Sequence, residues 1–366
     1  MRKDICLNAF DYYAAGADVM VTLKENREAF ERSVCIHGTT LLGHRISSPI
    51  CVAPSAMHRM AHLDGEISST SAAARADTCY ILSTISTTIK PILMLYAGTN
   101  YTFKDRELTR GLALRADKAG YKSIVLTVDM PILGHREPDF CNRFSLPNHL
   151  TMANFTQVGG AHERGVNSLR DSGLAEYVSE LFDLTINWNN VKWLKSITNL
   201  PVIVKGVLCL EDAKIAVDWD YGVAATIDTL PANVKAVDGR AKVYFLDGGV
   251  FRGTDVFNAL ALGARAVFLG RPILFGLAHS VSGVYYRLIL LMGEDGVANV
   301  FRILNNELKH AILFSGTATL ADIRYGGSTS PPFVCPSWLA TTTIVTMNGG
   351  SISMEFPNKD IQDQLF

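Results

Sequence analysis

The chain lacks the features that mark secreted, nucleic-acid-binding or metal-stabilised proteins. Its 34 basic and 35 acidic side chains nearly cancel, to a net charge of −1. No overall field therefore attracts nucleic acid, an anionic membrane or a cationic partner. The seven cysteines are scattered and never spaced Cys-x-x-Cys, which argues against a disulfide framework or a zinc ribbon and predicts a reducing, intracellular compartment.

Long apolar segments are also missing. The N-terminus lacks the apolar centre of a secretory signal, and no run of about 18 or more apolar residues is available to span a bilayer. The last residues, Asp363-Gln364-Leu365-Phe366, differ from a Ser-Lys-Leu peroxisomal address. We therefore expect no signal peptide, no membrane span and no nucleic-acid partner.

The composition instead fits one large α/β domain, with 366 residues of which 48% are hydrophobic and 19% charged. Short apolar runs rich in β-branched residues alternate with amphipathic segments, a pattern typical of a parallel sheet buried on both faces. Seven runs are predicted strands, at 49–53, 79–83, 92–96, 123–128, 201–205, 243–246 and 266–269. Helices are predicted at 66–76, 107–119, 211–217, 231–237 and 254–262.

Eight such units would close a (β/α)8 TIM barrel, an α/β fold whose active site lies at the carboxyl ends of the strands. The helices at 211–217 and 231–237 follow one another without a recognisable strand between them. We therefore predict that one βα unit, the sixth strand and its loop, is missing from the barrel. Residues 1–325 are expected to form this domain, and 326–366 a separate tail with a hairpin around Asn348-Gly349-Gly350.

The last two predicted strands end in residues suited to binding a phosphate. Asp247-Gly248-Gly249 follows one strand, and Gly270-Arg271 follows the next. Small residues expose backbone N–H groups, and arginine adds a bidentate donor. An isolated glycine pair more often serves a tight turn, but two such loops at consecutive strand ends predict a phosphate site. Because phosphate loops do not decide the chemistry, a sugar-phosphate isomerase or aldolase stays open at this point.

Further motifs carry a resemblance to a known family. In order along the chain these are 11–17, Ala53-Pro54-Ser55-Ala56-Met57, 126–129, Gly134-His135-Arg136, 201–206, the Asp-Gly-Gly run and Gly270-Arg271-Pro272. Together they resemble the FMN-dependent 2-hydroxy acid oxidases, which include glycolate and lactate oxidases, from about Phe10 to Ile323.

The resemblance implies an FMN site and a substrate site. Pro54, Ser55 and Ala56 would line the flavin through their backbone, Ser83 and Thr127 would hydrogen-bond it, and Lys205 would lie at its N1/O2 edge. An ammonium there stabilises the negative charge that develops on a reduced flavin. The implied cofactor set is completed by Asp247, Gly248, Gly249, Arg252, Gly270 and Arg271, and the implied substrate-binding set is Tyr12, Tyr96 and Arg136.

Without the resemblance, these residues have ordinary interpretations. Lys205 would be a paired lysine at a strand end, Tyr12 and Tyr96 interior aromatics, and Arg136 a surface ion-pair former. Only the ordered set of motifs favours the functional interpretation.

The sequence also departs from the family pattern. Relatives carry a loop reading Ser-Asn-His-Gly-x-Arg-Gln, which supplies the catalytic base and a second carboxylate-binding arginine, and this chain has no such segment. His135 is the nearest replacement base in the sequence. Met94 and Ile85 replace a flavin-contacting Gln and an active-site Trp, and Phe251 replaces a phosphate-side Arg, for which Arg252 could substitute.

Two histidines have a spacing that can bind metal but lack the rest of the motif. His58 and His62 stand four apart without the glutamate of His-Glu-x-x-His. We therefore predict no metal site.

Two functions follow from these expectations. The first is FMN-dependent oxidation of a small (S)-2-hydroxy acid to a 2-oxo acid, with O2 reduced to hydrogen peroxide. Without the base, proton abstraction would lose about 10²–10⁴-fold in rate. The second is a non-catalytic FMN-binding paralogue or a truncated isoform. The resemblance further implies a homo-oligomer, a tetramer in relatives, and a peroxisomal location. Because the last residues do not form a peroxisomal signal, a cytoplasmic location is the alternative.

Overall fold

The computed structural model describes a defined part of the chain. The described residues are 38–88, 97–100, 102–129, 141, 146–147, 149–155, 181–225, 229–230, 233–234, 244–282, 289–317, 320, 323, 346–348 and 351–353. The chain divides into two compact units, Met1–Arg324 and Tyr325–Phe366. In the second unit, β13 (Thr346–Asn348) pairs antiparallel with β14 (Ser351–Ser353), which confirms the predicted hairpin.

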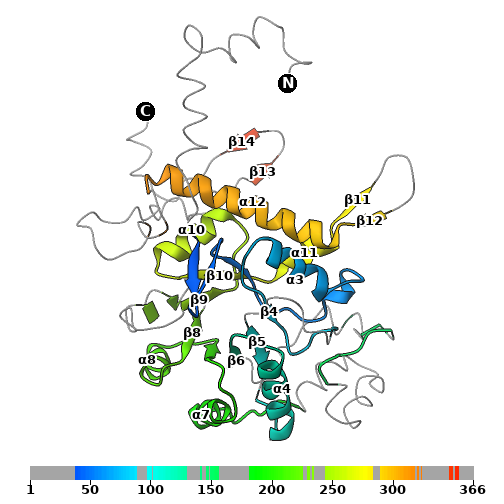
Figure 1. Ribbon diagram of the computed structural model, residues 1–366. Coiled ribbons are helices and arrows are strands. Elements are labelled where there is room, and N and C mark those ends of the chain that lie inside the picture. Colours follow the sequence, from blue (N-terminus) through cyan, green and yellow to red (C-terminus); the bar gives the residue numbers. More distant parts are fainter. Residues whose placement is uncertain are drawn as a thin grey trace, which may run out of the picture. The chain divides into compact units, whose positions relative to one another are not determined.

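The first unit is built around one sheet of eight strands (Figure 1). In chain order these are β3 (Ile50–Val52), β4 (Ile81–Leu82), β5 (Ala97–Asn100), β6 (Ile124–Thr127), β7 (Val202–Lys205), β8 (Gly222–Ala225), β9 (Tyr244–Asp247) and β10 (Ala266–Leu269). All of their pairings are parallel. The two end strands meet through a parallel bridge between Val52 and Tyr80, with Val52 N–H donating to the Cys79 carbonyl at 2.9 Å. This contact closes the sheet into a barrel.

The described sheet contains a strand at the place where the sequence predicts that the sixth strand is missing. Strand β8 lies between β7 and β9 and pairs with both, with Val223 opposite Val204 on one side and Tyr244 on the other. Its sequence, Gly222-Val223-Ala224-Ala225, contains a single β-branched residue. All four residues are buried, so neither strand propensity nor polar alternation marks them as a strand.

Helices follow the strands on the outside of the barrel. They are η1 (His58–Met60), α3 (Glu66–Arg75), α4 (Arg106–Lys118), α7 (Trp188–Ile197), α8 (Leu210–Asp218), α10 (Gly253–Ala261), α11 (Arg271–Ala278) and α12 (Gly293–Phe314). Figure 1 shows α12 lying along α10, α11 and α3, and it contacts all three. Helices α3, α4, α8 and α10 match the predicted segments, whereas 231–237 lies largely outside the described residues.

A further strand is predicted at 92–96. The next described strand along the chain is β5, which begins at Ala97. Residues 92–96 themselves lie outside the described part of the chain.

The side chains of the barrel strands form two separate cores. Those that point outward, such as Leu126, Val204 and Val267, pack against the helices. Those that point inward form a second cluster, which includes Val125, Ile203, Phe245 and Phe268. The alternation follows directly from the two-residue period of a strand.

A short hairpin closes one end of the inner core. Strands β1 (Thr39–Leu41) and β2 (His44–Ile46) pair antiparallel immediately before β3. Leu41 and Ile46 belong to the inward-facing cluster. The hairpin therefore lies at the end where the barrel strands begin, and leaves free the end where they finish, which we call the mouth.

The described residues also include a short strand pair and four cysteines. Strands β11 (Ser280–Ser282) and β12 (Ile289–Leu291) form an antiparallel pair before α12. The cysteines of the described residues, Cys51, Cys79, Cys141 and Cys209, are all free thiols. Within the described part of the chain, every helix is too short or too polar to cross a membrane.

Candidate active site

The alternation that builds the inner core also determines which residues line the mouth. Along β6, Val125 points into the barrel and Leu126 out of it, so Thr127 at the end of the strand points inward again. The same count places Lys205 after Ile203 on β7, and Asp247 after Phe245 on β9. The strand register makes Thr127 and Lys205 neighbours, because they lie opposite each other on β6 and β7.

The remaining strands contribute small residues at the same level. On β4, Ile81 points inward, and Ser83 follows two residues later. Ala53 belongs to the inner cluster and leads into Pro54-Ser55-Ala56. Gly270 follows inward-facing Phe268, and a Cβ built on Gly270 would lie 3.4 Å from Ser55 Oγ. The loops after β3 and β10 therefore approach each other at the mouth.

One cation at the mouth, Lys205, lies between two carboxylates. Lys205 Nζ lies 3.2 Å from Asp247 Oδ2 and 3.6 Å from Asp129 Oδ1. The Lys205 side chain is 16% exposed, so these pairs are partly shielded from solvent and the ammonium is held in one place. The cation thus faces the mouth from a fixed position.

Gly206 explains how Asp129 reaches this pair. Its φ is +94°, a left-handed conformation that favours glycine, and a Cβ there would lie 2.3 Å from the side chain of Asp129. Only glycine allows the two loops to approach so closely.

One polar atom at the mouth lacks a partner. Thr127 Oγ1 is buried and makes no hydrogen bond in the described structure. A buried hydroxyl without a partner is uncommon and costs free energy. A ligand that offers a hydrogen-bonding group at this position would satisfy it.

The predicted phosphate loops lie at the ends of β9 and β10, just before helices α10 and α11. Gly248 and Gly249 have φ values of +95° and +78°, and a Cβ built on either would meet no atom within 4 Å. Helix α11 begins at Arg271, and the N-termini of helices favour anions. The space beside these two glycines is therefore not filled by neighbouring parts of the described structure.

The connection to α10 holds Arg252 in place. The Asp255 carboxylate accepts hydrogen bonds from the backbone N–H groups of Phe251 and Arg252, at 2.9 and 2.8 Å. The Phe251 side chain is 51% exposed. Arg252 is exposed and forms no ion pair in the described part of the chain.

All twelve residues of the predicted cofactor set lie at the carboxyl ends of barrel strands or in the segments that directly follow them. The predicted substrate residues Tyr12, Tyr96 and Arg136, and the candidate base His135, lie outside the described residues. Asp129 was not predicted to contribute; its position in the 126–129 motif, directly after a buried strand, was the available signal.

Both histidines considered for metal have other partners. His58 is buried, with Nδ1 2.9 Å from Ser69 Oγ. His62 Nδ1 accepts a hydrogen bond from the Asp64 backbone N–H at 3.1 Å. The other ring nitrogen of His58, Nε2, is buried and has no hydrogen-bond partner in the described structure.

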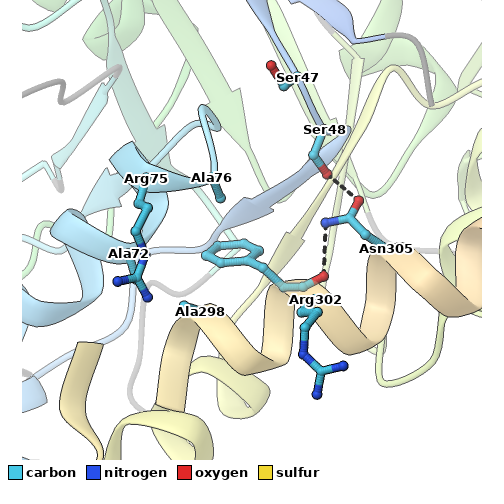
Figure 2. Close-up of a pocket in the computed structure, with 9 residues that line it drawn as sticks. Ser47, Ser48, Ala72, Arg75, Ala76, Ala298, Arg302 and Asn305 are labelled. Carbon is cyan, nitrogen blue, oxygen red and sulfur yellow. Dashed lines mark hydrogen bonds between the residues drawn. The ribbon is translucent and has the colours of Figure 1, made fainter. Parts of the chain in front are cut away.

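A pocket lies between α3 and α12, beside the residues that lead into β3 (Figure 2). This cavity, of about 400 Å³, is bordered by Ser48 before β3, by Arg75 on α3 and by Asn305 and Arg302 on α12. Its polar groups already have partners. Arg75 pairs with Glu294 and Asp295, Ser48 donates to Asn305, and Arg302 donates to Asn299. The charge of Arg75 is therefore paired with carboxylates, whereas the Arg302 guanidinium is bound by a neutral amide.

Comparison with known proteins agrees with the geometry of the mouth. The model of the FMN-dependent dehydrogenase family matches residues 1–327. Glycolate oxidase 1 of Zea mays is 45% identical over 346 residues, covering 86% of this chain and 89% of that protein. Glycolate oxidase 3 of Arabidopsis thaliana is 43% identical over 345 residues, with 86% and 89% covered.

Solved structures of mandelate oxidase show the same architecture. The complex with (S)-4-hydroxymandelic acid has a TM-score of 0.68 and 29% identity, covering 88% of this chain and 94% of that one. A variant solved with a C4a-OH-FMN adduct has a TM-score of 0.64 and 28% identity, with 88% and 95% covered.

Proposed function

Because the chain belongs to the FMN-dependent dehydrogenase family and is a homologue of the glycolate oxidases, with FMN as its cofactor, we propose that it oxidises a small (S)-2-hydroxy acid to the 2-oxo acid. In this reaction the substrate loses its hydroxyl proton and the hydrogen on the adjacent carbon together with two electrons, and O2 is reduced to hydrogen peroxide. The family match removes support for the sugar-phosphate alternative. The observation that carries the proposal is the inward-facing set at the mouth, Thr127, Lys205 and Asp247, with the unpartnered Thr127 hydroxyl among them.

The described residues fit the cofactor at both ends. Ser83 and Thr127 would hydrogen-bond the ring, against the backbone of Pro54, Ser55 and Ala56. Gly248, Gly249 and Gly270 leave backbone N–H groups accessible to the phosphate, and Arg252 and Arg271 add positive charge. Bound FMN supplies the two-electron acceptor.

Lys205 would contribute electrostatic stabilisation. Asp247 and Asp129 hold its ammonium by contacts of 3.2 and 3.6 Å. A cation that is already fixed costs no reorganisation when negative charge develops beside it. Substrate binding would fall to Tyr12, Tyr96 and Arg136, as the family resemblance implies.

The missing loop sets the expected rate. Only residues 226–228 lie between the end of β8 at Ala225 and Thr229, so the chain has no room there for Ser-Asn-His-Gly-x-Arg-Gln. A positioned general base contributes about 10²–10⁴-fold to proton transfer. We infer slow turnover, with His135 as the candidate replacement. The same deletion favours a second function, FMN binding without turnover by a non-catalytic paralogue or truncated isoform.

The test is to restore the loop. The native chain reconstituted with FMN should show a flavin band near about 450 nm, which anaerobic glycolate or lactate bleaches slowly. Insertion of Ser-Asn-His-Gly-x-Arg-Gln after Ala225 should accelerate bleaching by about 10²–10⁴-fold. An insertion with alanine in place of the histidine is the matched control.

Each result has a distinct meaning. Fast bleaching of the native chain would show that another residue is the base. Bound flavin that no 2-hydroxy acid bleaches, even with the loop restored, would support the non-catalytic function. Failure of the native chain to bind FMN would refute the proposal.

The family resemblance extends to assembly and location. We infer a homo-oligomer, and a tetramer by analogy with relatives. Met60, Leu63 and Ile67, close together in the sequence, are 47%, 74% and 40% exposed, and exposed apolar groups of this kind support a subunit contact. A peroxisomal location stays a prediction from the resemblance alone.

A further inference from the structure

Glu66 is a buried acid outside the proposed reaction. It is the first residue of α3 and is fully buried. A carboxylate in the interior is costly unless it is well hydrogen-bonded. Glu66 therefore does not have the usual role of a glutamate, which is to keep the protein surface polar.

The hydrogen bonds of Glu66 explain why its carboxylate is buried. Oε1 accepts from the backbone N–H of His58 at 3.2 Å and from the backbone N–H of Thr87 at 2.8 Å. Oε2 accepts from the hydroxyls of Thr87 at 2.8 Å and Thr88 at 2.7 Å. The carboxylate thus binds groups on two segments that are far apart in the sequence.

These two segments are the loops that follow β3 and β4. The first loop carries Pro54, Ser55 and Ala56 and reaches Glu66 through His58. The second carries Ser83 and reaches it through Thr87. A direct backbone contact, from Met57 N–H to the Ile85 carbonyl at 3.1 Å, joins them nearer the mouth. Glu66 lies behind this contact and fixes both loops from the helix side.

A simpler role for Glu66 would be to stabilise the N-terminus of α3 with its negative charge, since acidic residues are common in the first turn of a helix. In that role the carboxylate usually accepts from N–H groups of its own helix. The hydrogen bonds of Glu66 instead go to the neighbouring loops. The contacts therefore indicate loop positioning rather than helix capping.

We propose that Glu66 is a positioning residue that sets the separation of the loops after β3 and β4, and thereby the shape of the flavin-ring side of the mouth. This inference rests on the proposed FMN site. Loss of the carboxylate would leave the barrel closed, because the Val52–Tyr80 bridge does not involve Glu66, but would allow the two loops to separate.

The test compares Glu66→Gln and Glu66→Ala with Asn305→Ala in the full chain. Asn305 accepts a hydrogen bond from Ser48 at the opposite end of the barrel, so its loss controls for general destabilisation. Three quantities are measured: FMN affinity by fluorescence titration of the apoprotein, the visible circular dichroism of bound flavin, and amide exchange in the peptides covering 54–58 and 83–88.

We expect Glu66→Ala to weaken FMN binding by about tenfold or more, to change the flavin dichroism and to increase exchange in both loops together. Glu66→Gln should fall between it and the native chain, because the amide keeps one acceptor. Asn305→Ala should leave all three readouts unchanged, even where its unfolding midpoint is similar to that of Glu66→Ala. Unchanged affinity in Glu66→Ala, or faster exchange in only one loop, would overturn the inference.

Failure of the proposed function gives results that differ from failure of the Glu66 inference. A native chain that binds FMN without turnover leaves all three readouts available. A native chain that binds no FMN refutes the proposed function and the effect of Glu66 on the cofactor, while the exchange measurement still decides whether Glu66 couples the two loops.

Discussion

At the scale of single residues, the interior behind the mouth contains a histidine that cannot readily be charged. His58 is packed against Glu66 and the ring of Tyr80, at 6.3 Å between ring centres. Burial lowers the pKa of His58 to about 4, and the nearby Glu66 carboxylate opposes this shift only in part. Burial also raises the pKa of the Tyr80 phenol, so Tyr80 stays neutral beside it.

This pKa predicts acid sensitivity. Unfolded His58 would take up a proton at its ordinary pKa of 6.5, whereas folded His58 resists until about 4. The unfolded state therefore binds more protons between these values, and stability falls as the pH falls through that window. By pH 5 the loss attributable to His58 should be about 2 kcal/mol.

Urea unfolding at pH 7 and pH 5 measures this loss. The variant His58→Gln should lose less stability over the same interval, because glutamine does not titrate. Identical losses in the two proteins would contradict the prediction.

At the scale of elements, the crossing of α11 and α12 depends on two glycines. A Cβ on Gly296 would lie 2.0 Å from the Gly276 carbonyl oxygen, and one on Gly276 would lie 2.8 Å from the Gly296 carbonyl oxygen. The helix backbones are therefore in contact at this point. Because α11 begins at Arg271, this crossing also positions the predicted phosphate loop.

We expect Gly296→Ala to push the two helices apart. Overpacking of this kind costs about 1–3 kcal/mol of unfolding free energy, and the displaced start of α11 should weaken FMN binding. Urea unfolding and FMN titration measure the two effects. Asn306→Ala, at an exposed position on the same helix, is the control and should be nearly neutral; a Gly296→Ala chain as stable as this control would contradict the prediction.

At the scale of the whole molecule, the first compact unit contains every described strand of the barrel and every residue of the predicted cofactor set. Helix α12 belongs to this unit, with Val297, Phe301, Leu304 and Leu308 buried in the outer core. The described core packing of the barrel therefore runs through α12 to Ile323, just before Tyr325.

We expect a chain ended after Arg324 to keep its cooperative unfolding, within a few degrees of the full chain's midpoint, and to bind FMN with the same affinity. A chain ended after Met292 should fail to fold, because it loses the apolar face of α12. Thermal unfolding and flavin titration of the two chains check both expectations. Loss of FMN binding in the longer chain would show that residues after Arg324 contribute to the site.

The order of residues was enough to predict the barrel class and, through the family resemblance, the FMN cofactor, and it also predicts the phosphate loops. Strands such as Ile124–Thr127 and Ala266–Leu269 are dense in apolar residues, and the glycines after β9 and β10 are local requirements of backbone conformation. These features depend on neighbouring residues in the chain, so they are visible in its order.

Only the tertiary structure decided the rest. Strand β8 is a strand because β7 and β9 pair with it on either side, not because Gly222 and Ala225 favour that conformation. The carboxylates around Lys205 come from other strand ends, and the groups bound by Glu66 come from two separate loops. Barrel closure brings these residues together from distant parts of the chain, and local propensity contains no information about such pairings.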